Sequence, residues 1–301
     1  MSGYQEILAF GEEELHKSGI EQTEAKSCAW ILFSYCFCMS RIDFLMNCIE
    51  WQEMSAEDET HLQQYKELLK KRASGIPVQY LTHEQNFYGY DFYVDERVLI
   101  PRQDTEVLIE CVEQMVAQEL LRKQQMTAGT LLDLCTGSGC IAITLANVLK
   151  WDKVWASDIS EDALCVAEQN NMAHGSLVKF RQGDLFAPFE QFKAAFDVIV
   201  SNPPYIESAV LKTLSKEVLE HEPRMALDGR EDGLYFYRRI VKEAREYLKK
   251  EGLLFLEIGY NQGEAVKALC NEAGYENVRV VADLAGLDRV VCARYCGAGL
   301  L

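Results

Sequence analysis

From residue 130 onward, the sequence alternates between short apolar runs and longer helical stretches, and this pattern limits the possible folds more than any other feature. Helical stretches lie between most of the runs, for example at 161–174 and 235–250. Strands that alternate with helices predict a doubly wound α/β sheet that is mainly parallel. The seven predicted strands are 130–134, 153–157, 178–181, 197–200, 253–257, 278–281 and 289–293.

The N-terminal residues 1–75 show only helical signals and predict a small helical bundle. Ser55 and Asp58 match a capping box, and the apolar stripe that follows them ends at Gly75. The longest apolar stretch, 28–39, is too short to span a bilayer and predicts a buried core helix.

Residues 76–103 have a different character, because their aromatic residues are separated by turn residues, as in a strand pair. We therefore predict a hairpin connector at 76–103 and one α/β domain at 104–301. Asp104 is expected to be the N-cap of the first helix of that domain.

A glycine turn follows the first strand of the α/β domain, in the sequence Asp-Leu-Cys-Thr-Gly-Ser-Gly-Cys-Ile-Ala from Asp133. Gly137 and Gly139 permit a tight turn and a close backbone approach to a ligand at a helix N-terminus. Asp158 ends the second strand, where a carboxylate accepts hydrogen bonds from ribose hydroxyls. This combination predicts an adenosine-containing ligand, either NAD or S-adenosylmethionine. Asp133 favours S-adenosylmethionine, whose ammonium group needs an acceptor near the turn.

Two residues after the third strand suit the base of such a ligand. Asp184 could accept a hydrogen bond from the adenine amine, and Leu185 could pack on the ring. The alternative is that these residues form a plain surface turn.

The fourth strand ends in Asn202, Pro203, Pro204 and Tyr205. The two prolines fix φ and remove two backbone donors, so this loop is stiff and presents carbonyl oxygens. The Asn202 side-chain oxygen adds a second acceptor, which suits a planar NH₂ group, and Tyr205 can stack on the flat face of that group. Fixed acceptors raise electron density on such a nitrogen and align it for methyl transfer.

Charge and cysteine content restrict the possible partners. The net charge is −17, and a strongly acidic surface disfavours phosphate backbones, so no stable nucleic-acid binding is expected. The eleven cysteines are scattered without zinc-site spacing, so we predict reduced thiols and no metal. The acidic N-terminus has no secretory signal, and we expect a cytoplasmic, monomeric protein that does not bind membranes.

The chain resembles the glutamine methyltransferases that modify peptide-chain release factors. The Ile-Pro-Arg-x-Asp-Thr-Glu segment within 99–106 is the most specific match, whereas Asn-Pro-Pro-Tyr is also found in adenine and cytosine amine methyltransferases. The matching segments are 75–81, 99–106, 133–142, 202–206, 222–223, 226–229 and 252–263.

The resemblance implies a seven-stranded S-adenosylmethionine-dependent methyltransferase domain and an N-terminal helical domain that helps to dock the release factor. The implied substrate is the glutamine of a Gly-Gly-Gln tripeptide, methylated on its side-chain amide nitrogen, an activity that modulates translation termination. Asn202 to Tyr205 would hold the glutamine, with Phe87 or Tyr88 walling the pocket and Asn202, Pro203 and Tyr205 as catalytic residues. The residues implied to contact the cofactor are Asp133, Cys135, Thr136, Gly137, Ser138, Gly139, Asp158, Asp184, Leu185 and Asn202.

Two positions depart from the family pattern. Cys135 stands where many relatives have glycine, and it fits the turn if its φ is negative. Gln103 stands where many relatives have proline.

Three alternative functions stay open. They are a nucleic-acid amine methyltransferase, an NAD-dependent oxidoreductase, which has no use for the Asn-Pro-Pro sequence, and a non-catalytic binding module.

Overall fold

The computed structural model describes residues 3–49 and 56–297 of the chain. It divides into two compact units, Met1–Glu84 with Lys216–His221, and Gln85–Ser215 with Glu222–Leu301. The domain boundaries expected at residues 75 and 103 stay predictions. Ser55 lies outside the described residues, so the predicted capping box does too.

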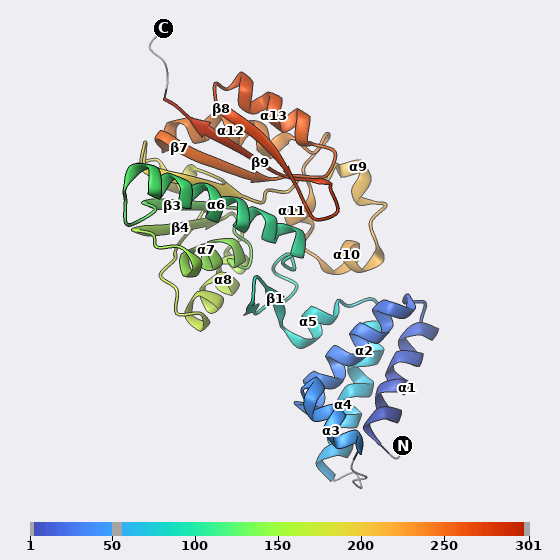
Figure 1. Cartoon of the computed structure of the whole chain (residues 1–301). Helices are drawn as coiled ribbons and strands as arrows, with labels where there is room; N and C mark the ends of the chain where they lie inside the picture. The colour runs from blue at the N-terminus through green and yellow to red at the C-terminus, as the bar shows by residue number, and fades with distance from the viewer. Residues whose placement is uncertain (1–2, 50–55, 298–301) are drawn as a thin grey trace. The chain divides into compact units, whose positions relative to one another are not determined.

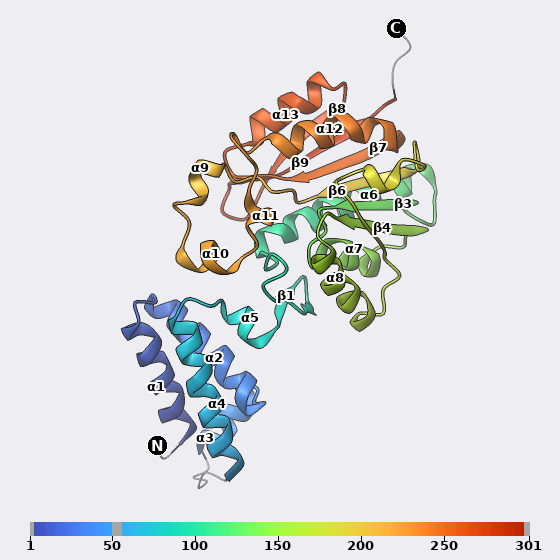
Figure 2. The ribbon, with the colours of Figure 1, turned by 180° about the vertical axis from the view of Figure 1, so that it is seen from behind.

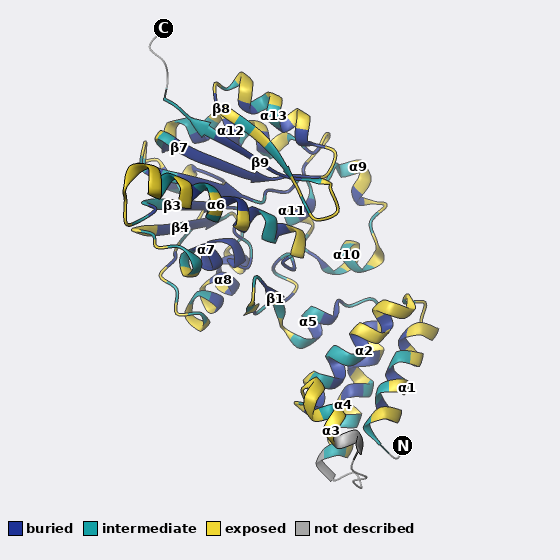
Figure 3. Ribbon diagram, in the orientation of Figure 1, coloured by how far each residue is buried: buried dark blue, intermediate teal, exposed yellow. Residues whose placement is uncertain are grey.

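The helical unit packs around a cluster of aromatic side chains centred on Phe33, which is fully buried. The ring of Phe33 stacks on Phe37 with 4.6 Å between centroids and meets Tyr65 edge to face at 6.0 Å. The dark blue segments of α2 in Figure 3 mark its buried residues, which share this cluster with buried residues of α1 and α4. The helices of this unit are α1 Tyr4–Lys17, α2 Gln22–Phe37, α3 Arg41–Ile49, α4 Ala56–Ala73, α5 Val78–Thr82 and α10 Lys216–His221.

A buried arginine joins α10 to the N-terminal helices of the same unit. Arg72, on α4, is only 3% exposed, and its Nη2 donates to Glu24 at 2.5 Å and to Glu217 at 2.8 Å. Two carboxylates compensate the cost of burying one guanidinium. Glu217 is distant in sequence, so the helical unit is completed by a segment that follows most of the sheet along the chain.

The second unit is built on a seven-stranded sheet with the order β5-β4-β3-β6-β7-β9-β8. The first five strands in this order are parallel, whereas β9 runs antiparallel to both neighbours. The predicted doubly wound fold is therefore confirmed, and each predicted strand overlaps an observed one. The strands are β3 Thr130–Leu134, β4 Lys153–Asp158, β5 Lys179–Gln182, β6 Phe196–Ser201, β7 Leu248–Glu257, β8 Glu276–Ala282 and β9 Asp288–Tyr295.

Helices cover both faces of this sheet because successive strand residues point to opposite sides. On β3, Leu131 packs into the layer formed with α6 Glu106–Lys123 and α7 Cys140–Val148. The next residue, Leu132, packs into the layer formed with α12 Tyr235–Tyr247 and α13 Gly263–Glu272. Figures 1 and 2 show these two layers on either side of the strands.

Short elements connect the major ones. A hairpin of β1 Gln85–Phe87 and β2 Tyr90–Phe92 lies within the predicted connector. The others are α8 Glu161–Ala173, α9 Ser208–Leu211, α11 Arg224–Leu227 and the 3₁₀ helices η1 Gln103–Thr105 and η2 Ala187–Phe189.

Two predicted helix boundaries are wrong. The helix expected at 235–250 ends at Tyr247, because Leu248 adopts an extended backbone and pairs with Phe196 in the sheet. Leu248 is buried in either arrangement, so hydrophobic periodicity cannot locate this end. Asp104 is not an N-cap: it lies in η1, and its carboxylate is 3.2 Å from Nη2 of Arg289.

Ten of the cysteines are free in the structure, and six of these are buried, where a thiol packs as a small apolar group. Within residues 3–49 and 56–297, every helix is too short or too polar to cross a bilayer.

Phe33→Ala is expected to lower the free energy of unfolding of the helical unit by roughly 3–5 kcal/mol, because it opens a cavity where the aromatic rings meet. Hydrogen exchange of the α1, α2 and α4 amides in the full chain measures this loss. Tyr35→Ala is the control, since Tyr35 is on the same helix but is 44% exposed. Equal protection in both variants would show that the ring cluster does not stabilise the unit.

Candidate functional site

Four side chains lie in one row at the carboxyl ends of adjacent parallel strands. Leu134 of β3 is paired with Ser157 of β4 and Ser201 of β6, and Ser201 is paired in turn with Leu256 of β7. The residue that comes after each of these paired residues therefore lies beside the corresponding residue of the neighbouring strand. Ligands of open α/β sheets bind beyond this edge, at the point where the strand order reverses. The row consists of Cys135, Asp158, Asn202 and Glu257.

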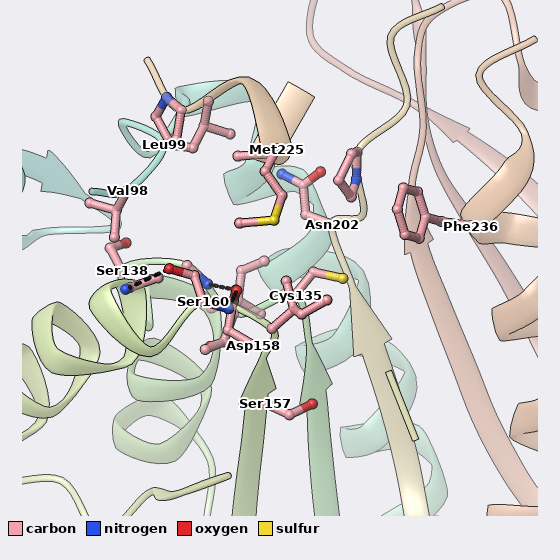
Figure 4. Close-up of a pocket in the computed structure, with 18 of the residues that line it drawn as sticks. Val98, Leu99, Cys135, Ser138, Ser157, Asp158, Ser160, Asn202, Met225 and Phe236 are labelled. Atoms are coloured by element: carbon pink, nitrogen blue, oxygen red, sulfur yellow. Dashed lines mark hydrogen bonds between the residues drawn. The ribbon is translucent and has the colours of Figure 1, made fainter. Parts of the chain in front are cut away.

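A pocket opens at this edge, and most of the predicted site residues line it. Figure 4 shows Asp158 and Ser160 beside the end of β4, with Asn202 and Met225 across the pocket from them. The predicted residues that line the pocket are Cys135, Thr136, Gly137, Ser138, Asp158, Asp184, Leu185, Asn202 and Pro204. The other predicted residues, Asp133, Gly139, Pro203, Tyr205 and Phe87, are not part of its lining.

The glycine turn between β3 and α7 has the conformation that its sequence predicts. Gly137 has φ +54° and Gly139 has φ +82°, values that favour glycine. A Cβ on Gly139 would lie 2.9 Å from Cδ1 of Ile143, whereas a Cβ on Gly137 would meet nothing within 4 Å. Gly139 is thus needed for packing of the helix, and Gly137 leaves open space beside the pocket.

Cys135 also adopts a left-handed backbone, with φ +60°, so it occupies the turn without the negative φ on which its fit was expected to depend. A non-glycine residue in this region carries a strain of roughly 1 kcal/mol or more. Burial raises the pKa of the Cys135 thiol, and the nearby Asp158 carboxylate adds to the effect. The thiol therefore stays protonated and acts as a small apolar wall of the pocket.

Asp158 is held at the pocket by the backbone on both sides of it. Its Oδ2 accepts from the Gly137 N–H at 2.9 Å, and its Oδ1 accepts from the Ser160 N–H at 3.0 Å. Burial raises the pKa of this carboxyl, while the backbone donors oppose the rise. Each oxygen retains lone pairs that can accept from a ligand hydroxyl.

Asp133 lies beneath the turn rather than on the pocket wall. It is fully buried, and its Oδ2 accepts from Thr136 Oγ1 at 2.6 Å. Its Oδ1 has no hydrogen-bond partner among the described residues. Burial raises the pKa of Asp133 to about 7, although the Thr136 hydrogen bond opposes this. The side chain fixes Thr136 and thereby the start of the turn.

Asp184 and Leu185 line the end of the pocket nearest β5. Leu185 is buried and has φ +50°. Both Asp184 oxygens accept from Nη1 of Arg239, at 3.0 and 2.9 Å. Arg239 comes from α12 and also lines the pocket, beside Tyr235 and Phe236. The Asp184 carboxylate is thus engaged by an arginine that the sequence analysis did not single out.

The loop 202–205 after β6 is held in place by contacts to the backbone of its last residue, Tyr205. The carbonyl oxygen of Tyr205 accepts from Gln262 Nε2 at 3.0 Å. Gly229 and Gly233 pack against the same residue, since a Cβ on either would come within 2.7 Å of Tyr205 backbone atoms. Burial raises the pKa of the Tyr205 hydroxyl, so it stays protonated.

The structure does not bring Phe87 to the pocket. Phe87 is fully buried in the sheet core, where its ring meets Phe92 edge to face at 6.1 Å. Tyr88 is partly buried, and its hydroxyl donates to Glu113 of α6. The pocket lining includes instead residues of the segment before α6 and of the region around α11, namely Val98, Leu99, Pro101, Arg102, Pro223, Met225 and Ala226.

Part of this pocket lining is predicted from the sequence only through the resemblance. The segments 99–106 and 222–223 matched the family without an assigned role, and the structure joins them through an ion pair between Arg102 and Glu222. Met225, Phe236 and Arg239 carried no motif signal. Glu257 was covered by a matching segment but was not singled out.

Comparison with known proteins identifies the family. A family model described as "Methyltransferase small domain" matches residues 105–230, and the "PrmC N-terminal domain" matches residues 6–82. The release factor glutamine methyltransferase of Bacillus anthracis is 39% identical over 289 residues, covering 96% of this chain and 98% of that protein. The chain belongs to the release factor glutamine methyltransferase family.

A second curated relative agrees with this assignment. The release factor glutamine methyltransferase of Moorella thermoacetica is 46% identical over 228 residues, covering 75% of this chain and 77% of that protein. A solved structure described as a release factor-specific protein-(glutamine-N5) methyltransferase from Alicyclobacillus acidocaldarius is 30% identical and covers 65% of this chain and 94% of its own, with a TM-score of 0.36. As a member of the family, the chain is a methyltransferase.

The described part of this methyltransferase holds no group of three or more His, Cys, Asp or Glu side chains arranged to bind a metal ion.

Asp133→Asn is expected to gain stability relative to the wild type as the pH rises from about 4 to about 7. The native pKa of Asp133, about 7, exceeds the ordinary value of 3.8, so the wild type loses stability as the pH rises through this window. The difference is on the order of 1.4 kcal/mol for each pH unit crossed and is constant above pH 7. Urea unfolding at several pH values measures it, with exposed Asp162→Asn as the control. Parallel pH profiles for wild type and Asp133→Asn would contradict the expectation.

Proposed function

We propose that this chain transfers a methyl group from S-adenosylmethionine to the side-chain amide nitrogen of the glutamine in the Gly-Gly-Gln tripeptide of peptide-chain release factors. The observation that carries the proposal is the position of Asn202, which lines the same pocket as Ser138 and Asp158. Acceptors for an amide and a turn suited to an adenosine ligand thus share one cavity. Family membership supports the choice of a glutamine over other planar amines.

The residues present fit S-adenosylmethionine. Gly137 leaves open space at the turn, and both Asp158 oxygens retain lone pairs toward ribose hydroxyls. Leu185 supplies an apolar surface for the adenine ring. When bound, the cofactor supplies a methyl group on a positively charged sulfur, which keeps the electron pair of the broken carbon–sulfur bond while the amide nitrogen releases a proton.

Asp133 does not line the pocket, so we assign it a role other than direct contact with the ammonium group of the cofactor. Its carboxylate is fully buried beneath the turn, and it accepts a hydrogen bond from Thr136, which lines the pocket. We propose that Asp133 acts by holding Thr136 and by placing negative charge behind the turn. Its charge would still favour a cationic ligand, because electrostatic attraction is weakly screened in a buried setting.

The loop residues would orient the acceptor amide. Pro203 and Pro204 have no N–H groups, so their carbonyl oxygens and the Asn202 side-chain oxygen meet no competing backbone donors. Two fixed acceptors on one NH₂ group raise electron density on its nitrogen and hold it in line for transfer. Tyr205 was expected to stack on the amide plane, but it does not line the pocket, so we propose that it acts by fixing the loop through its backbone.

The two predicted domains have distinct proposed roles. We propose that the helical residues 1–75 help to dock the release factor and that 76–103 connect them to the catalytic residues 104–301. The acidic net charge suits a partner with a basic surface.

A peptide methylation assay tests the proposed function. A synthetic peptide that contains Gly-Gly-Gln is incubated with the chain and S-adenosylmethionine, and mass spectrometry locates any added methyl group. A methyl group on the glutamine amide is the expected result. An unmodified glutamine, together with methylation of an RNA or DNA sample run in parallel, would refute the proposal in favour of a nucleic-acid amine.

Asn202→Ala is expected to reduce turnover by roughly two to three orders of magnitude, because one preorganised polar group is lost at the reacting nitrogen. Cofactor affinity should change much less, which equilibrium binding of S-adenosylmethionine measures. Asn147→Ala, at the exposed C-terminal end of α7, is the control for removal of an amide side chain. Near-normal turnover of Asn202→Ala would refute the assigned role.

Asp158→Ala is expected to weaken S-adenosylmethionine binding by roughly 1.5–3 kcal/mol, the usual contribution of hydrogen bonds to a charged group. Isothermal titration calorimetry gives the affinity directly. Asp158→Asn retains one acceptor oxygen and should show a smaller loss, whereas exposed Asp152→Ala should bind like the wild type. Unchanged affinity in Asp158→Ala would show that the ribose is held elsewhere.

A further inference from the structure

An ion pair between Asp184 and Arg239 lies at the end of the pocket nearest β5. Both residues line the pocket, and Nη1 of Arg239 donates to the two Asp184 oxygens at 3.0 and 2.9 Å. The two side chains are 47% and 28% exposed, so solvent screens their attraction and the pair contributes little to the stability of the fold. A role in binding a ligand accounts better for its position at the pocket.

The turn that carries Asp184 is fixed relative to Asp158. The Gly183 N–H donates to the Asp158 carbonyl oxygen at 2.9 Å, and the Ala187 N–H donates to the Asp184 carbonyl oxygen at 3.0 Å. A Cβ on Gly183 would lie 2.7 Å from Cδ of Pro188, so this part of the backbone is also closely packed. The residue proposed to hold the ribose and the residue at the base end of the pocket are thus kept at one spacing.

Arg239 is held on α12 by the residues one turn before and one turn after it. Tyr235, Arg239 and Glu243 recur at intervals of four residues and so share one face of the helix. The guanidinium carbon lies 5.8 Å from the centroid of the Tyr235 ring, and Nε is 3.5 Å from Oε1 of Glu243. Together with Asp184, these two partners fix the position of the guanidinium.

Both members of the ion pair retain hydrogen-bonding capacity. Nη2 of Arg239 makes no hydrogen bond to a described residue, so its N–H groups are available to a ligand. Each Asp184 oxygen has two lone pairs, of which the contact with Arg239 uses one. Since a carboxylate only accepts hydrogen bonds and a guanidinium only donates them, the pair offers an acceptor beside a donor at the pocket.

We propose that Arg239 makes this pocket specific for adenine: it holds the Asp184 carboxylate as a fixed acceptor for the adenine amine and presents its own N–H groups to the ring nitrogen beside that amine. This inference rests on the proposed function, in which the cofactor is S-adenosylmethionine. Adenine displays an amine donor next to a ring-nitrogen acceptor, a pattern that a paired acceptor and donor recognise. Hypoxanthine has a carbonyl oxygen in place of the amine, and that oxygen would face the Asp184 carboxylate with no hydrogen between them.

The arginine is needed because a half-exposed aspartate does not keep one orientation by itself. Without Arg239, the Asp184 carboxylate would be hydrated and free to change rotamer, and its ordering by a ligand would cost affinity. The ion pair orders the carboxylate before the ligand arrives, which lowers that cost. Arg239 therefore acts on the choice of base, whereas Asp158 acts on the ribose.

Equilibrium binding of two ligands to the full wild-type chain tests the inference. The ligands are S-adenosylhomocysteine, which is the product of methyl transfer, and S-inosylhomocysteine, in which hypoxanthine replaces adenine. Isothermal titration calorimetry is expected to show about 10- to 100-fold higher affinity for the adenine compound, the range for one good bidentate contact to a base. Equal affinities in the wild type overturn the inference, and this comparison needs no variant to fold.

Arg239→Gln is expected to lose most of this selectivity. Its affinity for the adenine compound should fall about 5- to 30-fold, while its affinity for the hypoxanthine compound stays within about threefold of the wild type. Arg238→Gln is the matched control, since Arg238 is the neighbouring residue, pairs with Asp232 and is not part of the pocket lining. A wild-type affinity ratio in Arg239→Gln overturns the inference, and so does an equal loss for both compounds.

Asp184→Asn tests the acceptor half of the pair. Its amide can donate to the carbonyl oxygen of hypoxanthine, so this variant should bind the hypoxanthine compound more tightly than the wild type does. An affinity ratio that does not change in Asp184→Asn also overturns the inference. A wild type that binds neither compound and does not bind S-adenosylmethionine overturns the proposed function instead, so the two failures are distinct.

Discussion

The parallel pairing of β4, β3, β6 and β7 is the constraint on which the rest of the site depends. Leu134 pairs with Ser157 and Ser201, and Ser201 pairs with Leu256, so the residues that come next, Cys135, Asp158, Asn202 and Glu257, fall side by side. A slip of one residue in any strand would turn its side chain to the opposite face of the sheet. The two packed helical layers resist that slip, since each strand places alternate apolar residues in both.

This edge gathers three carboxyls in different surroundings. Asp158 accepts from two backbone N–H groups and Asp133 from the Thr136 hydroxyl, whereas Oε2 of Glu257 has no hydrogen-bond partner among the described residues. Burial raises the pKa of all three. The hydrogen bonds of Asp133 and Asp158 fix the orientation of the glycine turn, which apolar residues could not do.

The site residues that can be predicted from the sequence are those that lie at the end of a predicted strand and within a recognisable motif. Asp158, Asn202 and Gly137 line the pocket because parallel strands carry their ends to a common edge. Phe87 does not, since an aromatic residue in a short strand suits a core as well as a pocket wall. Glu257 also ends a strand, but its place beside Asn202 follows from the pairing of Leu256 with Ser201, and register across strands cannot be read from one sequence. The left-handed φ of Cys135 departs from what residue type alone favours.

The pairing of Arg72 with Glu217 bears on the order in which the chain is made. These residues are 145 positions apart, yet both belong to the helical unit, and Arg72 is almost entirely buried there. At about 5–20 residues per second, synthesis from Arg72 to Glu217 takes on the order of ten seconds. Throughout that interval Arg72 has the Glu24 carboxylate as a charge partner but not the Glu217 carboxylate. The first segment to be made is thus among the last to acquire its complete set of native contacts, and a chaperone would meet it in that partly compensated state.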